Sequence, residues 1–124
     1  VGDWKIKNYN KNKIKKDENF LLNLEKNIDI LSNISNHNSL RPKLVIGFAA
    51  ETNNLKDNAK KKLNEKNCDM IIYNKISNDN KVFGLNENKI SVITKDKVKN
   101  YSKTSKVNCA KHIIDSIYNQ IRIK

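Results

Sequence analysis

The sequence has few cysteines and no long hydrophobic run. Its only cysteines, Cys68 and Cys109, lie far apart and lack metal-ligand spacing, so neither a disulfide framework nor a zinc site is indicated. Such usage is typical of a reducing cytoplasm, where we expect the protein to reside. No apolar stretch approaches the roughly 20 residues of a membrane span, and no charged-then-apolar leader opens the chain. We therefore expect no membrane partner and no export.

Acidic residues are scarce, with 13 Asp and Glu against 25 Lys and Arg and a formal net charge of +12. This balance favours anionic partners such as nucleotides or nucleic acid. Lys, Asn and Ile dominate the sequence, however, and their A/T-rich codons would produce part of the same basicity in a biased genome. Arginine is scarce and no nucleic-acid-binding motif is present, so we rank a basic nucleic-acid-binding module low and expect no nucleic acid partner.

Glycine-rich phosphate loops of the dinucleotide or Walker type are also missing. A phosphate ligand would therefore have to be held by lysines and helix ends. With 124 residues, 37% of them hydrophobic and 31% charged, the chain suits one domain, or part of one, whose core is concentrated in a few apolar runs. Val1 stands directly before a dense motif, which favours residues 1–124 as the C-terminal portion of a single domain whose N-terminal half is absent.

The clearest fold signal is an apolar, β-branched run at 43–49, which we expect to be a buried parallel strand covered on both faces. A helix over 52–67 and a second buried strand at 69–73 follow it, so residues 43–73 read as a βαβ unit. Ligands bind outside the carboxyl ends of such strands. This rule alone places Phe48, Ala49, Ala50, Glu51 and Asn74 at a candidate site.

The remaining elements are weaker. We expect a basic loop after a strand end within 1–19, an edge strand at 20–25, and a short helix over 28–34 with Asn27 as N-cap. Residues 89–94 and 97–101 are expected to form a hairpin through Lys95 and Asp96. Ser105 is expected to cap a final helix to about Ile121, whose apolar stripe comprises Cys109, Ile113, Ile114 and Ile117.

Several motifs, in register along the whole chain, resemble one enzyme family. Gly47 to Thr52 reads Gly-Phe-Ala-Ala-Glu-Thr, followed by Ala59, Lys62 and Lys66 on a helix and then by Asp69 and Asn74. Asp3-Trp4-Lys5, Lys13-Ile14-Lys15-Lys16 and Lys26-Asn27-Ile28-Asp29-Ile30 precede them in order. Together these segments resemble the phosphopantothenate-cysteine ligase family, which belongs to coenzyme A biosynthesis.

The resemblance implies a Rossmann-like three-layer α/β fold with a mainly parallel sheet, and a homodimer. It also implies CTP and Mg²⁺, used to convert 4'-phosphopantothenate to an acyl-cytidylate from which the amine of L-cysteine displaces CMP. A free carboxylate is a poor electrophile, so it needs such a leaving group, and lysines and magnesium neutralise the gathered phosphates. FMN would belong only to a decarboxylase domain fused upstream, outside this chain.

Carried over position by position, the resemblance implies a set of nucleotide contacts. Lys13 is the implied catalytic residue, a lysine in a basic loop that closes over phosphate. Lys62 and Lys66 lie four apart on one helix face and can reach one phosphate chain. Glu51 and Asn74 are possible additions, and the metal ligands are unknown. The implied CTP contacts are Asp3, Lys13, Glu25, Lys26, Asn27, Ile28, Phe48, Lys62 and Lys66.

Three positions depart from the family pattern: Ile28 replaces a proline, Lys75 an aspartate and Gly2 an alanine. These departures bear on fine geometry near the site. Without the N-terminal half, we expect the chain alone to be inactive. The alternative interpretation is a non-catalytic, nucleotide-binding remnant of the same fold.

Overall fold

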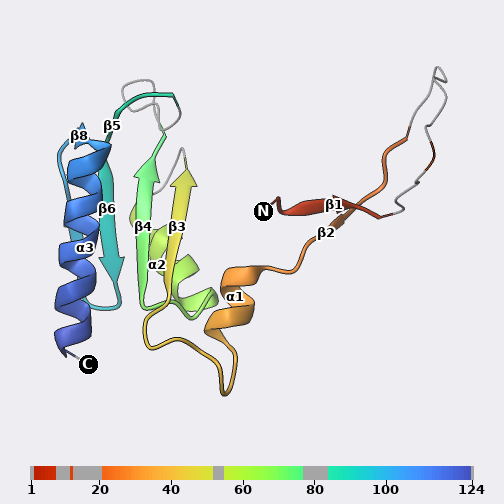
Figure 1. Ribbon diagram of the computed structural model, residues 1–124, viewed down its shortest axis with the longest axis horizontal. Coiled ribbons are helices and arrows are strands. Elements are labelled where there is room, and N and C mark those ends of the chain that lie inside the picture. Colours follow the sequence, from red (N-terminus) through yellow and green to blue (C-terminus); the bar gives the residue numbers. More distant parts are fainter. Residues whose placement is uncertain (1, 8–11, 13–20, 52–54, 77–83, 124) are drawn as a thin grey trace.

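The computed structural model describes residues 2–7, 12, 21–51, 55–76 and 84–123, and it shows a mixed α/β protein (Figure 1). A body of sheet and helices comprises the described residues from Ile30 onwards, and an arm comprising the described residues from Gly2 to Asp29 projects from it. The elements are β1 (Trp4–Ile6), β2 (Leu24–Lys26), α1 (Ile30–Ser35), β3 (Ile46–Glu51), α2 (Leu55–Glu65), β4 (Met70–Lys75), β5 (Glu87–Asn88), β6 (Ile90–Thr94), β7 (Val98–Asn100), β8 (Thr104–Ser105) and α3 (Lys106–Ile123).

The central sheet has four strands in the order β3-β4-β6-β7. β3 and β4 are parallel and joined by α2, which confirms the βαβ unit. β6 pairs antiparallel with both β4 and β7, and the hairpin through Lys95 and Asp96 is also confirmed. Within the described residues, parallel pairing is thus limited to β3 with β4, and the sheet is mixed rather than mainly parallel.

Alternation along the strands sends apolar side chains to both faces of this sheet. Ile71 and Tyr73 of β4 face α2, whereas Met70 and Ile72 face α3. Beside them α2 contributes Ala59 and Leu63 to one core cluster, and α3 contributes Cys109, Ile113 and Ile117 to the other. No helix in the described ranges is long and apolar enough to cross a membrane.

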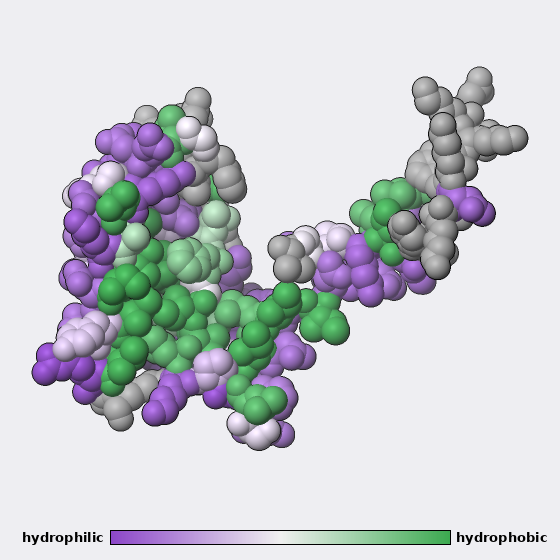
Figure 2. All heavy atoms as spheres, in the orientation of Figure 1, coloured by the Kyte–Doolittle hydropathy of each residue, from purple (hydrophilic) through white to green (hydrophobic). Residues whose placement is uncertain are grey.

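The covering of β3 differs from the expectation. Val45, just before β3, and Ala49 are buried, but Phe48 is 68% exposed, so the strand is not covered on both faces. α3 lies over β4 and β6 rather than over β3. Apolar residues consequently remain visible on the sheet and α1 in the space-filling view (Figure 2).

The final helix begins as expected, because the Ser105 hydroxyl accepts a hydrogen bond from the Asn108 backbone N–H at 3.2 Å. The assignment of Ile114 to its buried stripe was wrong, since this residue is 62% exposed. Ile113 already faces the sheet, and the next residue of a helix points about 100° further round the axis.

The arm is an antiparallel pairing of β1 with β2. The strand expected at 20–25 is shorter and begins later, at Leu24, while Phe20 lies outside the described residues. Backbone hydrogen bonds extend the pairing on both sides, from Lys7 N–H to Asn23 and from Asn27 N–H to Asp3, each at 2.9 Å. These bonds, rather than a core, hold the described part of the arm together.

The N-cap of α1 is Asp29, so the assignment of Asn27 to this position was wrong. An Asp29 carboxylate oxygen accepts from the Ser32 N–H at 2.9 Å. The Asn27 side chain instead donates to the Gly2 carbonyl at 2.7 Å, which ties the helix entry to the start of the arm.

Close approach of α1 to the sheet depends on Gly47. A Cβ atom at this position would lie 2.7 Å from Leu31 Cδ2 and 2.8 Å from Ile71 Cδ1, inside contact distance. The missing side chain therefore lets α1 pack directly on β3 and β4.

Candidate functional site

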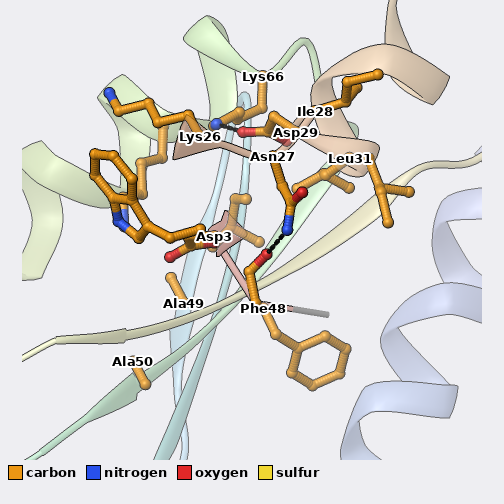
Figure 3. Close-up of a pocket in the computed structure, with 15 residues that line it drawn as sticks. Asp3, Lys26, Asn27, Ile28, Asp29, Leu31, Phe48, Ala49, Ala50 and Lys66 are labelled. Carbon is orange, nitrogen blue, oxygen red and sulfur yellow. Dashed lines mark hydrogen bonds and ion pairs between the residues drawn. The ribbon is translucent and has the colours of Figure 1, made fainter. Parts of the chain in front are cut away.

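A pocket of about 600 Å³ lies where the arm meets the body (Figure 3). This volume is in the range of small-molecule sites. Elements far apart in the sequence form its wall: the arm, α1, β3, the end of α2 and one residue of β4. The lining residues are Gly2, Asp3, Trp4, Lys26, Asn27, Ile28, Asp29, Ile30, Leu31, Phe48, Ala49, Ala50, Lys62, Lys66 and Ile71.

Asn27 fixes the arm residues that line the pocket. Its backbone N–H donates to the Asp3 carbonyl at 2.9 Å, and its side-chain amide donates to the Gly2 carbonyl at 2.7 Å. The Asp3 carboxylate is thereby presented from a main chain that is fixed on both sides. Next to it, the Lys26 ammonium lies 5.7 Å from the centroid of the Trp4 ring, a cation–π distance.

Two lysines reach the pocket from α2 and the residue that follows it. Lys62 and Lys66 are four residues apart and both half-buried, on the helix face that meets α1. Lys66 makes an ion pair with Asp29 across the top of the pocket (Figure 3). Both positively charged groups therefore lie on one side of the cavity.

β3 supplies the opposite side of the pocket. The Phe48 ring projects away from the Lys66–Asp29 pair in Figure 3. Ala49 and Ala50 follow it, and their short side chains leave room over the strand end. An exposed aromatic ring beside small residues is suited to the flat face of a ligand.

The site thus combines three lysines, two aspartates and the two exposed rings of Trp4 and Phe48. Lys26, Lys62 and Lys66 favour an anionic group, and Phe48 favours a planar one. Asp3 offers acceptors to amine or hydroxyl donors. The arrangement can bind a molecule that joins a charged chain to a ring, as a nucleotide does.

The structure brings together every nucleotide contact implied by the resemblance except Lys13 and Glu25. Lys13 lies outside the described residues. The carboxylate of Glu25 instead pairs with Lys5 at 3.1 Å on the surface of the arm.

Of the two possible additions to the site, Asn74 is not among the described lining residues. The side chain of Asn74 points to the α3 side, where its oxygen accepts from Asn88 at 2.9 Å. Glu51 ends β3 opposite Lys75, and its side chain lies outside the described part of the chain.

Sequence reasoning missed Asp29 and Trp4 as lining residues. Both residues were named only as members of the quoted motifs. The signal for both was proximity to motif residues, since Trp4 follows Asp3 and Asp29 follows Ile28. No group of three or more His, Cys, Asp or Glu residues that could hold a metal gathers anywhere in the described ranges.

Asp69, a motif residue, has a structural position outside the pocket. Its carboxylate accepts from the Val45 N–H at 2.8 Å and pairs with Arg41 at 2.9 Å. Arg41 also donates to the carbonyls of Ser35 and Asn67. The network joins the ends of α1 and α2 to the starts of β3 and β4, and it fixes the body wall of the pocket.

The two thiols are free and buried, and neither lines the pocket. Burial raises the pKa of Cys68, and the neighbouring Asp69 carboxylate raises it further. Burial also raises the pKa of Cys109. Both thiols are therefore poor nucleophiles near neutral pH.

Comparison with known proteins gives concordant results. A family model described as the DNA/pantothenate metabolism flavoprotein C-terminal domain matches residues 1–121. The coenzyme A biosynthesis bifunctional protein CoaBC of Haemophilus influenzae is 38% identical over 118 residues, which are 94% of this chain and 29% of that protein. CoaBC of Borreliella burgdorferi is 40% identical over 121 residues, 95% of this chain and 30% of that protein.

Among solved structures, the crystal structure of the C-terminal domain of CoaBC is similar to this fold with a TM-score of 0.68 and 31% sequence identity. The match covers 83% of this chain and 46% of that one. The chain therefore spans about three tenths of its curated relatives and less than half of a solved domain.

Proposed function

Because the chain belongs to the DNA/pantothenate metabolism flavoprotein C-terminal domain family, we propose that it is the nucleotide-binding portion of a CTP-dependent phosphopantothenate-cysteine ligase. In this reaction a carboxylate oxygen of 4'-phosphopantothenate attacks the α-phosphorus of CTP, and pyrophosphate leaves. The amine of L-cysteine then attacks the acyl carbon, CMP leaves and the nitrogen loses a proton. The product is phosphopantothenoylcysteine, and the pathway is coenzyme A biosynthesis.

The observation that carries the proposal is the convergence of the pocket residues. Asp3, Lys26, Phe48, Lys62 and Lys66 come from the arm, β3 and the α2 region, yet they line one cavity. The family resemblance had assigned these same positions to CTP on sequence grounds. Such convergence of positions from separate segments is expected if they bind one ligand.

Different residues bind different parts of the nucleotide. Lys62 and Lys66 bind the phosphate chain, where they neutralise charge that would repel the carboxylate of the second substrate. Phe48 packs against the base, and Asp3 accepts from a base amine or a ribose hydroxyl. Lys13 remains the proposed catalytic residue, which stabilises the charge that develops at the reacting phosphate.

Magnesium enters this proposal with the nucleotide. Mg²⁺ usually keeps several waters and binds through substrate phosphates plus one or two carboxylates. The pocket offers the carboxylate of Asp3, a donor set of that size, whereas the carboxylate oxygens of Asp29 already bind the Ser32 N–H and Lys66. We therefore treat the metal as part of the Mg–CTP substrate. No residue of this chain is assigned to a flavin, and FMN would belong to a decarboxylase domain fused upstream.

We further propose a homodimer with a Rossmann-like, three-layer domain in the complete protein. Helices on the two faces of the sheet support the layering. The arm supports the dimer, because a two-stranded hairpin is at best marginally stable alone and this one exposes Trp4, Ile6 and Leu24. A second copy covering the arm would bury them. Two free thiols are consistent with the cytoplasm as the site of the reaction.

The test is CTP-dependent pyrophosphate release by the full-length protein, supplied with 4'-phosphopantothenate, L-cysteine and Mg²⁺. We expect turnover that requires all three substrates and is lost in the Lys62→Met and Lys66→Met variants. The matched control is Lys61→Met on the same helix, because the Lys61 side chain is exposed and does not line the pocket. CTP binding without turnover would identify a nucleotide-binding remnant, and an absence of both would disprove the proposal.

A further inference from the structure

The backbone of Lys66 is held firmly at the end of α2. Asn67 follows in the left-handed conformation with φ of 49°, and the Cys68 N–H reaches back to the Leu63 carbonyl at 3.0 Å. The Asn67 N–H also donates to the Asn64 carbonyl at 3.1 Å. These bonds form a Schellman cap, which fixes the direction in which the Lys66 side chain leaves the main chain.

Residues at both ends of α1 contact Lys66. The hydroxyl of Ser35, a completely buried residue at the end of α1, donates to the Lys66 carbonyl. The carboxylate of Asp29, at the start of α1, pairs with the Lys66 ammonium. One short helix therefore positions both the main chain and the side chain of this lysine.

The two oxygens of Asp29 have separate tasks. Oδ1 accepts from the Ser32 N–H at 2.9 Å and so caps α1, while Oδ2 binds Lys66. Because the capping hydrogen bond holds the carboxylate in position, the Lys66 ammonium binds an acceptor whose location is fixed. An unanchored lysine side chain would have to give up considerable rotamer freedom on binding a ligand.

We propose that Asp29 is a positioning residue, which holds the Lys66 ammonium at the pocket wall so that its remaining N–H donors meet the phosphates of the nucleotide. The inference rests on the proposed function and deepens it. Figure 3 shows the pair on the pocket side of α1, with the Lys66 chain running along the wall. Asp29 does this without being an implied nucleotide contact itself.

The experiment measures the dissociation constant for Mg–CTP by calorimetry in the full-length protein. Asp29→Asn retains an oxygen that can cap α1 but removes the charge that binds Lys66. We expect affinity to fall about tenfold, with KM for CTP raised and kcat little changed. The matched control is Glu65→Gln, which makes the same change at the exposed partner of Lys61 and should leave the affinity as it is.

A double variant separates positioning from other roles. In a Lys66→Met background, Asp29→Asn should cause no further loss, because the residue acts through Lys66. Equal losses in both backgrounds, or tighter CTP binding by Asp29→Asn, would overturn the proposal. A melting temperature that falls in Asp29→Asn as far as in Asp29→Ala would also overturn it, since the effect would then come from the cap.

A readout without nucleotide keeps this inference distinct from the proposed function. Amine labelling followed by mass spectrometry compares Lys66 with Lys61, and Asp29→Asn should raise the labelling rate of Lys66 several-fold while leaving Lys61 unchanged. Failure of the wild type to bind CTP would disprove the proposed function, and the labelling rate would still show whether Asp29 restrains Lys66. An equal labelling rate of Lys66 in the wild type and in Asp29→Asn would disprove that restraint.

Discussion

The body and the arm contain similar kinds of apolar residue but bury them very differently. In the body, Ile72 is 0% exposed and Tyr73 is 1% exposed between two helices. In the arm, Trp4 is 54% exposed and Leu24 is 48% exposed on strands that nothing covers in the described part of the chain. The body is therefore held by burial of apolar area, whereas the arm is held by backbone hydrogen bonds.

This difference bears on the candidate site, because the pocket is lined by residues of both the body and the arm. The body supplies Phe48, Lys62 and Lys66 from packed elements, while the arm supplies Asp3 and Lys26 from an uncovered hairpin. The body side is consequently positioned by a packed core, whereas the arm side is positioned by backbone pairing and by the hydrogen bonds of Asn27.

The largest effect is expected from truncation of the body core. Ile72→Ala should lower the free energy of unfolding by about 2–5 kcal/mol, since it leaves a cavity between the sheet and α3. Leu24→Ala in the arm should cost no more than about 0.5 kcal/mol, because the side chain is half exposed. Urea unfolding followed by circular dichroism measures both, and equal losses would contradict the comparison.

Removing an ion pair should also cost more stability in the body than in the arm. Asp69→Ala removes the carboxylate shared by Arg41 and the Val45 N–H, and we expect a loss of about 1–3 kcal/mol. Glu25→Ala removes the exposed partner of Lys5 and should cost less than about 0.5 kcal/mol. The same unfolding measurement applies. A cost for Glu25→Ala as large as that for Asp69→Ala would show that the arm depends on its charges.

At the junction, an exposed ring should matter for binding and little for stability. Phe48→Ala should weaken CTP binding about tenfold, within the range of about 1–3 kcal/mol for loss of a base-stacking ring, with little change in melting temperature. Tyr118→Ala provides the control, because Tyr118 is 59% exposed on α3 and does not line the pocket. Equal CTP affinities for wild type and Phe48→Ala, measured by calorimetry, would remove the ring from the site.

The smallest effect concerns the body alone, since the described arm contains no cysteine. The pKa of Cys68 is raised above its ordinary value of 9.0, so above this value the unfolded chain binds fewer protons at the thiol than the native one does. The free energy of unfolding therefore falls as pH rises through the window between the two pKa values. This decline should be shallower in Cys68→Ala than in the wild type, because the variant lacks the thiol whose pKa is raised by burial. Identical slopes in urea titrations would contradict the burial argument.

The sequence allowed most of the body to be predicted because its signals were local. The apolar run before Phe48 and the alternation in β6 specify strands whatever their partners, and Ser105 carries its cap signal beside the helix. In the arm, a strand end within 1–19 and an edge strand at 20–25 were expected, and β1 and β2 overlap both. Their pairing could not be predicted in this way, because it joins segments far apart in sequence and buries too little apolar surface to leave a pattern.

The candidate site was predicted through motifs, and its internal contacts were not. Asp3, Phe48 and Lys66 were recognised from the resemblance, and the structure places them in one pocket. The pairing of Lys66 with Asp29 depends on the packing of α1 beside the end of α2, a tertiary fact without a local signal. For the same reason Asn74 was placed at the strand end, although its side chain turns to Asn88.

Gly47 has a consequence for how the family can vary. A methyl group there would collide with the side-chain tips of Leu31 and Ile71, both of which line the pocket. A lineage that gains a side chain at position 47 has to rotate the flexible ends of Leu31 and Ile71, shorten one of them, or let α1 move outward, in which case Asp29 would move with α1. Positions 31, 47 and 71 form one steric unit, whose members are expected to change together across relatives.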